Sequence, residues 1–188
     1  SNKSITIAEE IGDKRQKGVS LSNNGVLYHN TGKYDDGLSY YKQSLEIVEE
    51  IGDKVGIIIV LNNIGLVYTL MERYDEAQDY LEKSLELQKA NKMKWLELET
   101  VAYLYYSYKK LGKDYENDKL QKLILNAENI EFELGFQLYK LLGDVSYLKS
   151  VYEQLQKKSS ALEDNMKEKY LSYPLPKQIV EAWEKVNF

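Results

Sequence analysis

Hydrophobic residues recur along the chain at helical spacing. Within residues 61–68, apolar and small residues occupy the i, i+3, i+4 and i+7 positions that share one face of a helix. A polar turn follows at Glu72 and Arg73, and residues 77–84 show the same spacing again. The pattern predicts two amphipathic helices joined by a short turn.

The whole pattern returns after forty residues. IAEEIGDK begins at Ile7 and IVEEIGDK begins at Ile47, and LSNNGVLYHNTGKYDDGLSYYKQSLEI from Leu21 aligns with LNNIGLVYTLMERYDEAQDYLEKSLEL from Leu61. Self-similarity at a period of about 20–50 residues is typical of a solenoid, in which each unit buries its apolar face against its neighbours. The sequence therefore predicts stacked helical hairpins.

Two weaker copies follow the two strong ones. Tyr108 aligns with Tyr68, and thirty-one residues later Tyr139 and Gly143 repeat the spacing of Tyr108 and Gly112. The predicted division is a second-helix remnant at 1–13, repeats at 14–53 and 54–93, degenerate repeats at 94–126 and 127–163, and a C-terminal capping segment at 164–188.

The repeated octapeptide predicts helix ends. Gly12 and Gly52 are suited to the left-handed conformation that ends a helix, and Asn91 is expected to replace glycine in the third instance. Asp13 and Asp53 are then predicted to cap the following helices.

Residues 1–13 align with the end of a second helix whose first helix is missing. We therefore expect the chain to be a fragment of a larger protein, with further repeats upstream. Ile5, Ile7 and Ile11 would then lack their covering helix, which predicts fraying or a homodimer through this exposed N-terminal end.

Each strong repeat carries small residues and tyrosines at matching places, which are Gly25, Tyr28, Tyr34 and Gly37 in the first and Gly65, Tyr68, Tyr74 and Ala77 in the second. This pattern resembles the tetratricopeptide repeat family, and the forty-residue period is similar to the long-repeat subgroup of kinesin light chains and related bacterial regulators. The resemblance implies an all-α, right-handed superhelix of antiparallel hairpins that binds extended protein segments in its concave groove.

By this resemblance, the side of each first helix opposite the packing residues lines the groove. The candidate peptide-binding residues are Val19, Ser22, Asn23, Val26, Asn30, Ile59, Asn62, Asn63, Leu66, Leu70, Tyr103 and Tyr106.

Asparagine side chains in this set suggest how a peptide would be held. Asn23 and Asn63 stand one repeat apart, and an amide both donates and accepts, so the pair could bond the backbone of an extended segment. Tyr103 and Tyr106 could form an aromatic shelf beside them. The alternatives are that Asn62 and Asn63 bond neighbouring helices and that the tyrosines pack against an extra helix.

Composition and charge narrow the classes of partner. The chain of 188 residues has a net charge of −5 and no basic block, which argues against nucleic acid. Its longest strictly apolar run, residues 57–61, is far shorter than the roughly 20 residues of a membrane span. The absence of cysteine excludes disulfides and thiolate chemistry and favours a reducing, cytoplasmic location.

No catalytic or cofactor motif is present in the sequence. His29 is the only histidine, and an exposed or rim position near the end of a first helix is the expectation for it. We therefore predict no enzyme activity, no cofactor and no metal. The basic cluster that the family uses to grip a terminal carboxylate is also missing, because its places hold Ser22, Val26, Glu99 and Tyr103.

The C-terminal segment differs from the repeats. Pro174 and Pro176 start a helix in which Ile179, Val180, Trp183 and Val186 form an apolar stripe, and this predicts a capping helix over the last hairpin. The stretch YPLPKQIVEAWEKV is similar to the C-termini of bacterial signalling proteins that carry tetratricopeptide repeats behind a nucleotide cyclase or ATPase domain.

The predicted function is a protein-interaction module that binds an extended peptide in the groove, within a larger signalling protein. The alternative is a structural repeat array that dimerises or packs on a cyclase- or ATPase-type domain without a peptide ligand.

Overall fold

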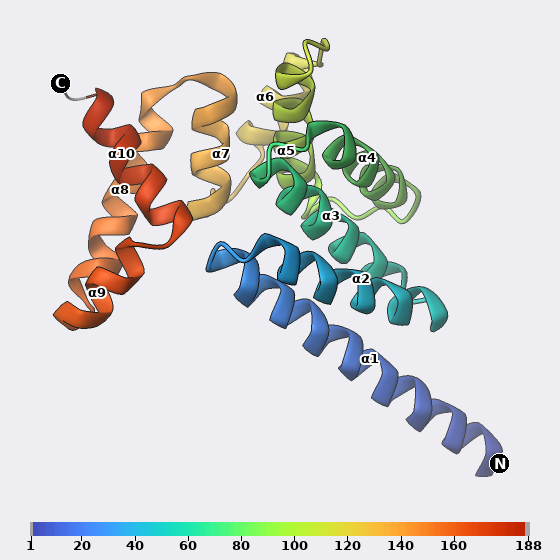
Figure 1. Ribbon diagram of the computed structural model, residues 1–188. Helices are drawn as coiled ribbons and strands as arrows, with labels where there is room; N and C mark the ends of the chain where they lie inside the picture. The colour runs from blue at the N-terminus through green and yellow to red at the C-terminus, as the bar shows by residue number, and fades with distance from the viewer. Residues whose placement is uncertain (1, 187–188) are drawn as a thin grey trace.

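The computed structural model describes the backbone of residues 2–186 and the side chains of residues 10–186. It is all-helical in this part of the chain (Figure 1). The helices are α1 (Asn2–Asn30), α2 (Tyr34–Glu50), α3 (Lys54–Leu70), α4 (Tyr74–Ala90), α5 (Glu97–Lys110), α6 (Asn117–Leu125), α7 (Phe132–Leu142), α8 (Val145–Ser160), α9 (Asp164–Leu171) and α10 (Pro174–Val186).

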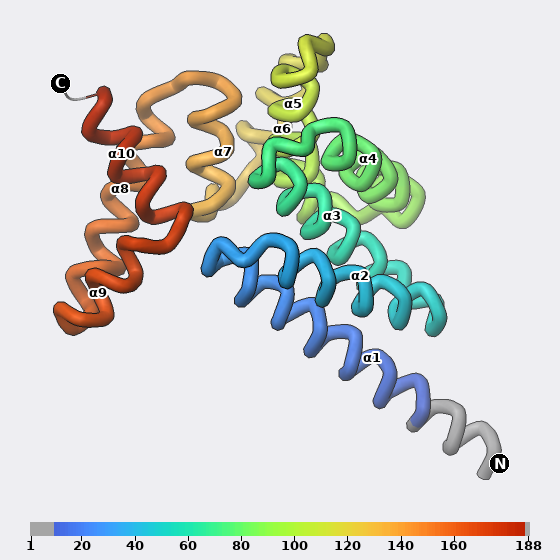
Figure 2. The backbone as a smooth tube through the Cα atoms, in the orientation of Figure 1, coloured from blue at the N-terminus to red at the C-terminus, as the bar shows by residue number. Residues whose placement is uncertain are grey.

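Consecutive helices pack as neighbours from α1 to α5, and α5 continues the stack onto both α6 and α7. The backbone trace follows this order, with α1 and α2 at one end of the molecule and α8–α10 at the other (Figure 2). This arrangement confirms the prediction of a tetratricopeptide-like helical solenoid.

Matching residues make matching contacts in the two strong repeats. The Ser44 hydroxyl donates to the carbonyl of Gly18 at 2.7 Å, and forty residues later Ser84 donates to the carbonyl of Ile58 at 3.0 Å. A Cβ built on Gly65 would lie 2.5 Å from Cγ of Leu81, so the glycine permits close helix approach within the hairpin. The conserved period therefore repeats specific contacts as well as hydrophobicity.

The turns between helices use left-handed residues at the same period. Gly32, Glu72 and Gly112 have φ of 81°, 60° and 69°, and they end the first helices of three successive hairpins. At the turns that join one hairpin to the next, Gly52 has φ 67° between α2 and α3, and Lys92 has φ 56° between α4 and α5. The prediction for Gly52 is confirmed, whereas the residue that replaces glycine is Lys92 instead of the predicted Asn91.

The first helix differs from the sequence prediction. α1 runs without a break through Gly12 and Asp13, so Gly12 does not end a helix and Asp13 does not cap one. Helical residues on both sides of Gly12 continue one helix, because each residue added to an existing helix contributes a further hydrogen bond. Asp53 does cap α3, since its Oδ1 accepts from the Gly56 N–H at 3.1 Å. The predicted apolar residues Ile5 and Ile7 lie outside the described side chains.

A second hydrophobic core holds the C-terminal end together. Its buried members are Phe132, Phe136, Leu148, Val151, Leu155 and Ile179, contributed by α7, α8 and α10. α10 packs on α8, and Trp183 stacks on Tyr152 with ring centroids 4.7 Å apart. This confirms the predicted capping helix, although Val186 of the predicted stripe is exposed.

No helix within the described residues is both long enough and apolar enough to cross a membrane.

Candidate functional site

The predicted groove residues differ widely in their accessibility. On α1, Val19, Asn23 and Asn30 are exposed. The next first helix is more enclosed, because Asn62 and Leu66 of α3 are buried. The remaining half-buried members are Ser22, Val26, Ile59, Asn63, Leu70 and Tyr106. The candidate surface is therefore open at α1 and becomes progressively enclosed toward α5.

Asn62 joins neighbouring helices and does not face a ligand. Its side chain is 1% exposed, its Nδ2 donates to Glu99 Oε1 at 3.0 Å, and its Oδ1 accepts from the Thr100 hydroxyl at 2.7 Å. Gln88 of α4 donates to the same Thr100 hydroxyl at 2.7 Å. The groove assignment of Asn62 is thus wrong, and the alternative that it braces adjacent helices holds.

Asn23 and Asn63 remain available for an intermolecular role. Asn23 is exposed and Asn63 is half-buried, and neither side chain forms a hydrogen bond among the described residues. An amide that is already on the surface and unbonded can pair with a peptide backbone without breaking an internal contact.

The two tyrosines of α5 do not form a common shelf. Tyr106 packs edge-on against Tyr74 with ring centroids 6.1 Å apart, and Lys140 lies 5.2 Å from the centre of its ring. Tyr103 is 4% exposed and instead lines two cavities. Packing by a later helix, α7, therefore accounts for Tyr106.

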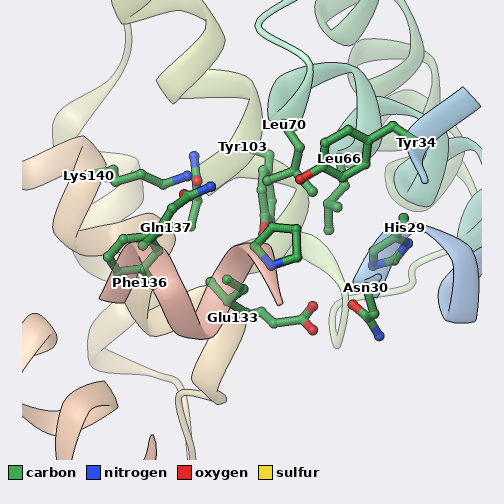
Figure 3. A pocket seen from close by; sticks show the side chains of 13 residues that line it. His29, Asn30, Tyr34, Leu66, Leu70, Tyr103, Glu133, Phe136, Gln137 and Lys140 are labelled. Carbon is green, nitrogen blue, oxygen red and sulfur yellow. The ribbon is translucent and has the colours of Figure 1, made fainter. Parts of the chain in front are cut away.

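The smaller cavity has a volume of about 30 Å³, which is room for a water molecule (Figure 3). It brings together four of the predicted residues, namely Asn30, Leu66, Leu70 and Tyr103. On the other side it is bounded by α7 and by the start of α10, including Pro174 and Leu175. The C-terminal segment thus closes one end of the predicted groove.

His29 lies in the wall of this cavity and is buried, contrary to the expectation of an exposed or rim position. Its Nδ1 and the Tyr41 hydroxyl share a hydrogen bond of 2.8 Å. Burial lowers the pKa of His29 to about 4, so the imidazole is neutral near pH 7. Its role is to connect α1 to α2.

Two polar side chains of α7 face the same cavity. Gln137 is 1% exposed, and neither its Nε2 nor its Oε1 has a hydrogen-bond partner. Beside it, burial lowers the pKa of the Lys140 amine to about 8, assisted by repulsion from Lys110. Figure 3 shows Gln137 and Lys140 extending from α7 on the side opposite His29 and Asn30.

A much larger cleft of about 870 Å³ lies between the start of α5 and the segment that connects α6 to α7. Tyr103 and Glu133 line both this cleft and the smaller cavity, so the two spaces adjoin. We name this larger space the acidic cleft, since its lining includes Glu97, Glu99, Glu128, Glu131 and Glu133.

Two carboxyl groups of the acidic cleft have raised pKa values. Burial raises the pKa of Glu99 to about 7, and the charges of Glu133 and Glu131 add to this, against the stabilising hydrogen bond from Asn62. Burial also raises the pKa of Glu133, again with a contribution from Glu131. The carboxylates therefore repel one another and lack sufficient solvation.

The contribution of α7 does not follow from the sequence alignment, because the fourth repeat has a different register. A Cβ on Gly135 would meet Cγ1 of Val151 at 2.6 Å, which is the contact that Gly65 makes with Leu81. Both pairs are sixteen residues apart, and this spacing could have identified Gly135 as the packing glycine. The alignment on Tyr139 instead concealed that Glu133 and Gln137 face the concave side.

Among the described residues, no three histidine or acidic side chains are placed to hold a metal ion. What the site offers is hydrogen-bonding amides, unpaired carboxylates and partly enclosed aromatic rings.

Comparison with known families agrees with this architecture. Residues 16–90 match the tetratricopeptide repeat family, whose members generally act as protein-interaction modules on a fold that is typically non-enzymatic. A search of curated protein sequences found no match to the chain. Residues 16–90 therefore carry the sequence pattern of the tetratricopeptide repeat family, within a tetratricopeptide-like helical solenoid.

Proposed function

We propose that this chain binds an extended segment of a partner protein along its concave surface, from the exposed face of α1 past α3 to the acidic cleft. The acidic cleft is the observation that carries the proposal, because a space of about 870 Å³ adjoins the predicted groove residue Tyr103. A space of this size is within the range of sites that enclose several side chains.

The unbonded amides of Asn23 and Asn63 support an extended ligand. They lie on the first helices of successive repeats, and each can donate and accept one hydrogen bond with a peptide backbone. Recognition of this kind fixes the direction of the segment, whereas side-chain pockets select its sequence.

The test is selection of binders from a phage-displayed library of random peptides, followed by affinity measurement on the purified chain. The double variant Asn23→Ala/Asn63→Ala should weaken the selected peptides by more than about 1 kcal/mol with an unchanged melting temperature. Gln43→Ala, an exposed amide on α2, is the matched control and should leave affinity intact. A double variant that binds as tightly as the parent would contradict the proposed groove.

A second copy of the chain is the alternative partner, and the length of α1 favours it. α1 has 29 residues against 17 in α2, and its N-terminal part projects beyond the other helices (Figure 1). Ile11 and Val19 are exposed along it. Sedimentation velocity over a concentration series would detect this dimer, and Ile11→Ser should abolish it, whereas a monomer at every concentration would contradict it.

A larger signalling protein as parent remains a proposal based on the C-terminal resemblance. It is consistent with the C-terminal helix α10 packing back on α8.

A further inference from the structure

The acidic cleft has a pronounced excess of negative charge. Five carboxylates line it, and Lys94 is the one basic residue among the described residues in its wall. Glu97 is paired with Lys119 at 3.3 Å. Within the described part of the chain, the other four acidic residues have no cation within ion-pair distance, namely Glu99, Glu128, Glu131 and Glu133.

Tyr103 adds a polar group without a hydrogen-bond partner among the described residues to the lining of the acidic cleft. Tyr103 is 4% exposed, and its hydroxyl makes no hydrogen bond with any described residue. A buried phenol normally finds a partner, because losing its contacts with water is costly. Tyr103 lines the acidic cleft together with Glu99 and Glu133, and burial raises the pKa of its hydroxyl, with a further contribution from the charges of these two residues.

The rest of the cleft favours a side chain over a bare ion. Leu96, Leu98 and Leu134 supply apolar lining, and Trp95 at the rim is 68% exposed. The described carboxylates do not converge into a metal-binding cluster. An elongated apolar stem with a cationic end matches this combination of walls and charge.

We propose that the acidic cleft receives an arginine or lysine side chain of the bound protein segment, with its cationic group between Glu99 and Glu133 and within reach of the Tyr103 hydroxyl. This inference rests on the proposed function, because the guest side chain belongs to the same segment that lies along α1 and α3.

The chemistry of a guanidinium fits these acceptors well. Its planar fork presents five N–H donors, enough to engage two separate carboxylates and the phenol oxygen together. The Trp95 ring is large and accessible, so it can cover the stem or stack on the cation. A bound cation also offsets the burial and the neighbouring negative charges that raise the pKa of Glu99 and Glu133.

The probe is Nα-acetyl-arginine methylamide, titrated at about pH 8 into isotopically labelled protein and followed by NMR, with the isosteric, uncharged citrulline analogue as control. We expect saturable shifts at the Trp95 indole N–H and at the amides of residues 126–134. The citrulline analogue should bind at least about tenfold more weakly.

Isosteric variants assign the effect to the cleft. Glu99→Gln/Glu133→Gln should weaken the arginine probe by at least about tenfold. Glu153→Gln, an exposed carboxylate of α8 outside the cleft, should change its affinity by less than about twofold. Equal binding of arginine and citrulline, indifference to the double variant, or shifts spread over surface carboxylates would each overturn the proposal.

The peptide selection separates this inference from the proposed function. Enrichment of arginine or lysine, lost on Glu99→Gln/Glu133→Gln, supports both. Peptides that need Asn23 and Asn63 but carry no basic residue would overturn the inference and leave the proposed function standing. A library without any binder would contradict the proposed function, and the inference would be overturned with it.

Discussion

The two halves of the molecule are built from the same kind of hairpin but differ in what they leave unpaired. In residues 14–93, equivalent residues make equivalent contacts at an interval of forty, as Ser44 and Ser84 do. In residues 94–186 the period fails, α6 shortens to nine residues, and a separate core forms around α7, α8 and α10. Both amide atoms of the buried Gln137 lack partners there, whereas in residues 14–93 the one such buried atom among the described residues is Oε1 of Gln88.

The difference shows where chemistry can develop in a solenoid. In the regular repeats, equivalent side chains such as Ser44 and Ser84 are satisfied by equivalent backbone partners, and the unbonded amides of Asn23 and Asn63 lie toward the surface. Where the register shifts, helices separate, a cleft opens, and polar side chains lose the neighbours that would have satisfied them. Four experiments, ordered by expected effect, test this contrast.

The largest effect should come from the separate C-terminal core. Ile179→Ala removes a fully buried side chain at the contact of α10 with α8, and should lower the free energy of unfolding by about 2–5 kcal/mol. Val186→Ala on the same helix, at an exposed position, should change it by less than about 0.5 kcal/mol. Chemical denaturation measures both. Equal effects would mean that α10 is not packed as a cap.

Two adjacent asparagines of α3 should behave oppositely. Asn62→Ala breaks the bonds to Glu99 and Thr100 and should cost about 1–3 kcal/mol of unfolding free energy. Asn63→Ala should cost less than about 0.5 kcal/mol, because no internal bond is lost. Thermal melts of the two variants measure this difference. A larger loss of stability for Asn63→Ala than for Asn62→Ala would contradict the roles assigned to the two residues.

The acidic cleft should make stability depend on pH. Because Glu99 has a pKa of about 7 in the folded state against 4.5 ordinarily, the folded protein binds the extra proton between these values. Its contribution is therefore fully present below about pH 4.5 and lost as pH rises through about 7. The groups facing it are Asn62, Tyr103, Glu131 and Glu133.

The measurement is the free energy of unfolding of the wild type and Glu99→Gln at about pH 5 and about pH 8. The wild type should lose about 1–3 kcal/mol relative to the variant between these values, after allowance for solvent screening. Glu86→Gln, an exposed carboxylate on α4, should leave the pH slope of the wild type in place. If Glu99→Gln leaves the dependence of the unfolding free energy on pH unchanged, Glu99 is not the source of that dependence.

The smallest effects should come from α1 and from the turn at Lys92. Gly12→Ala should stabilise the protein by about 0.5–1 kcal/mol, because Gly12 lies inside α1 with no atom within 4 Å of an added Cβ. Lys92→Gly should stabilise it by up to about 1 kcal/mol by relieving a left-handed lysine. Destabilisation by Gly12→Ala would instead indicate that a helix ends there, as the repeated octapeptide predicts.

The sequence was sufficient to predict the solenoid, the strong repeats and the capping helix, because each depends on local periodicity. It could not distinguish Asn62 from Asn63, since their burial depends on how α5 docks against α3. Nor could it place Glu133 and Gln137. The packing glycine of α7 is Gly135, which does not stand at the position that the alignment on Tyr139 predicts, so the side of α7 that faces the cavity was not evident. The acidic cleft arises from that shift and from the α6–α7 connection, which have no counterpart in the strong repeats.

The most direct test of the central claim is hydrogen–deuterium exchange with and without a peptide selected from the library. The account predicts slower exchange in residues 16–30, in α3, and at both walls of the acidic cleft, residues 94–103 and 126–137. It predicts no change in α2 and α4, which lie behind the first helices. Protection confined to α2 and α4, or to none of the concave segments, would contradict binding along the concave surface.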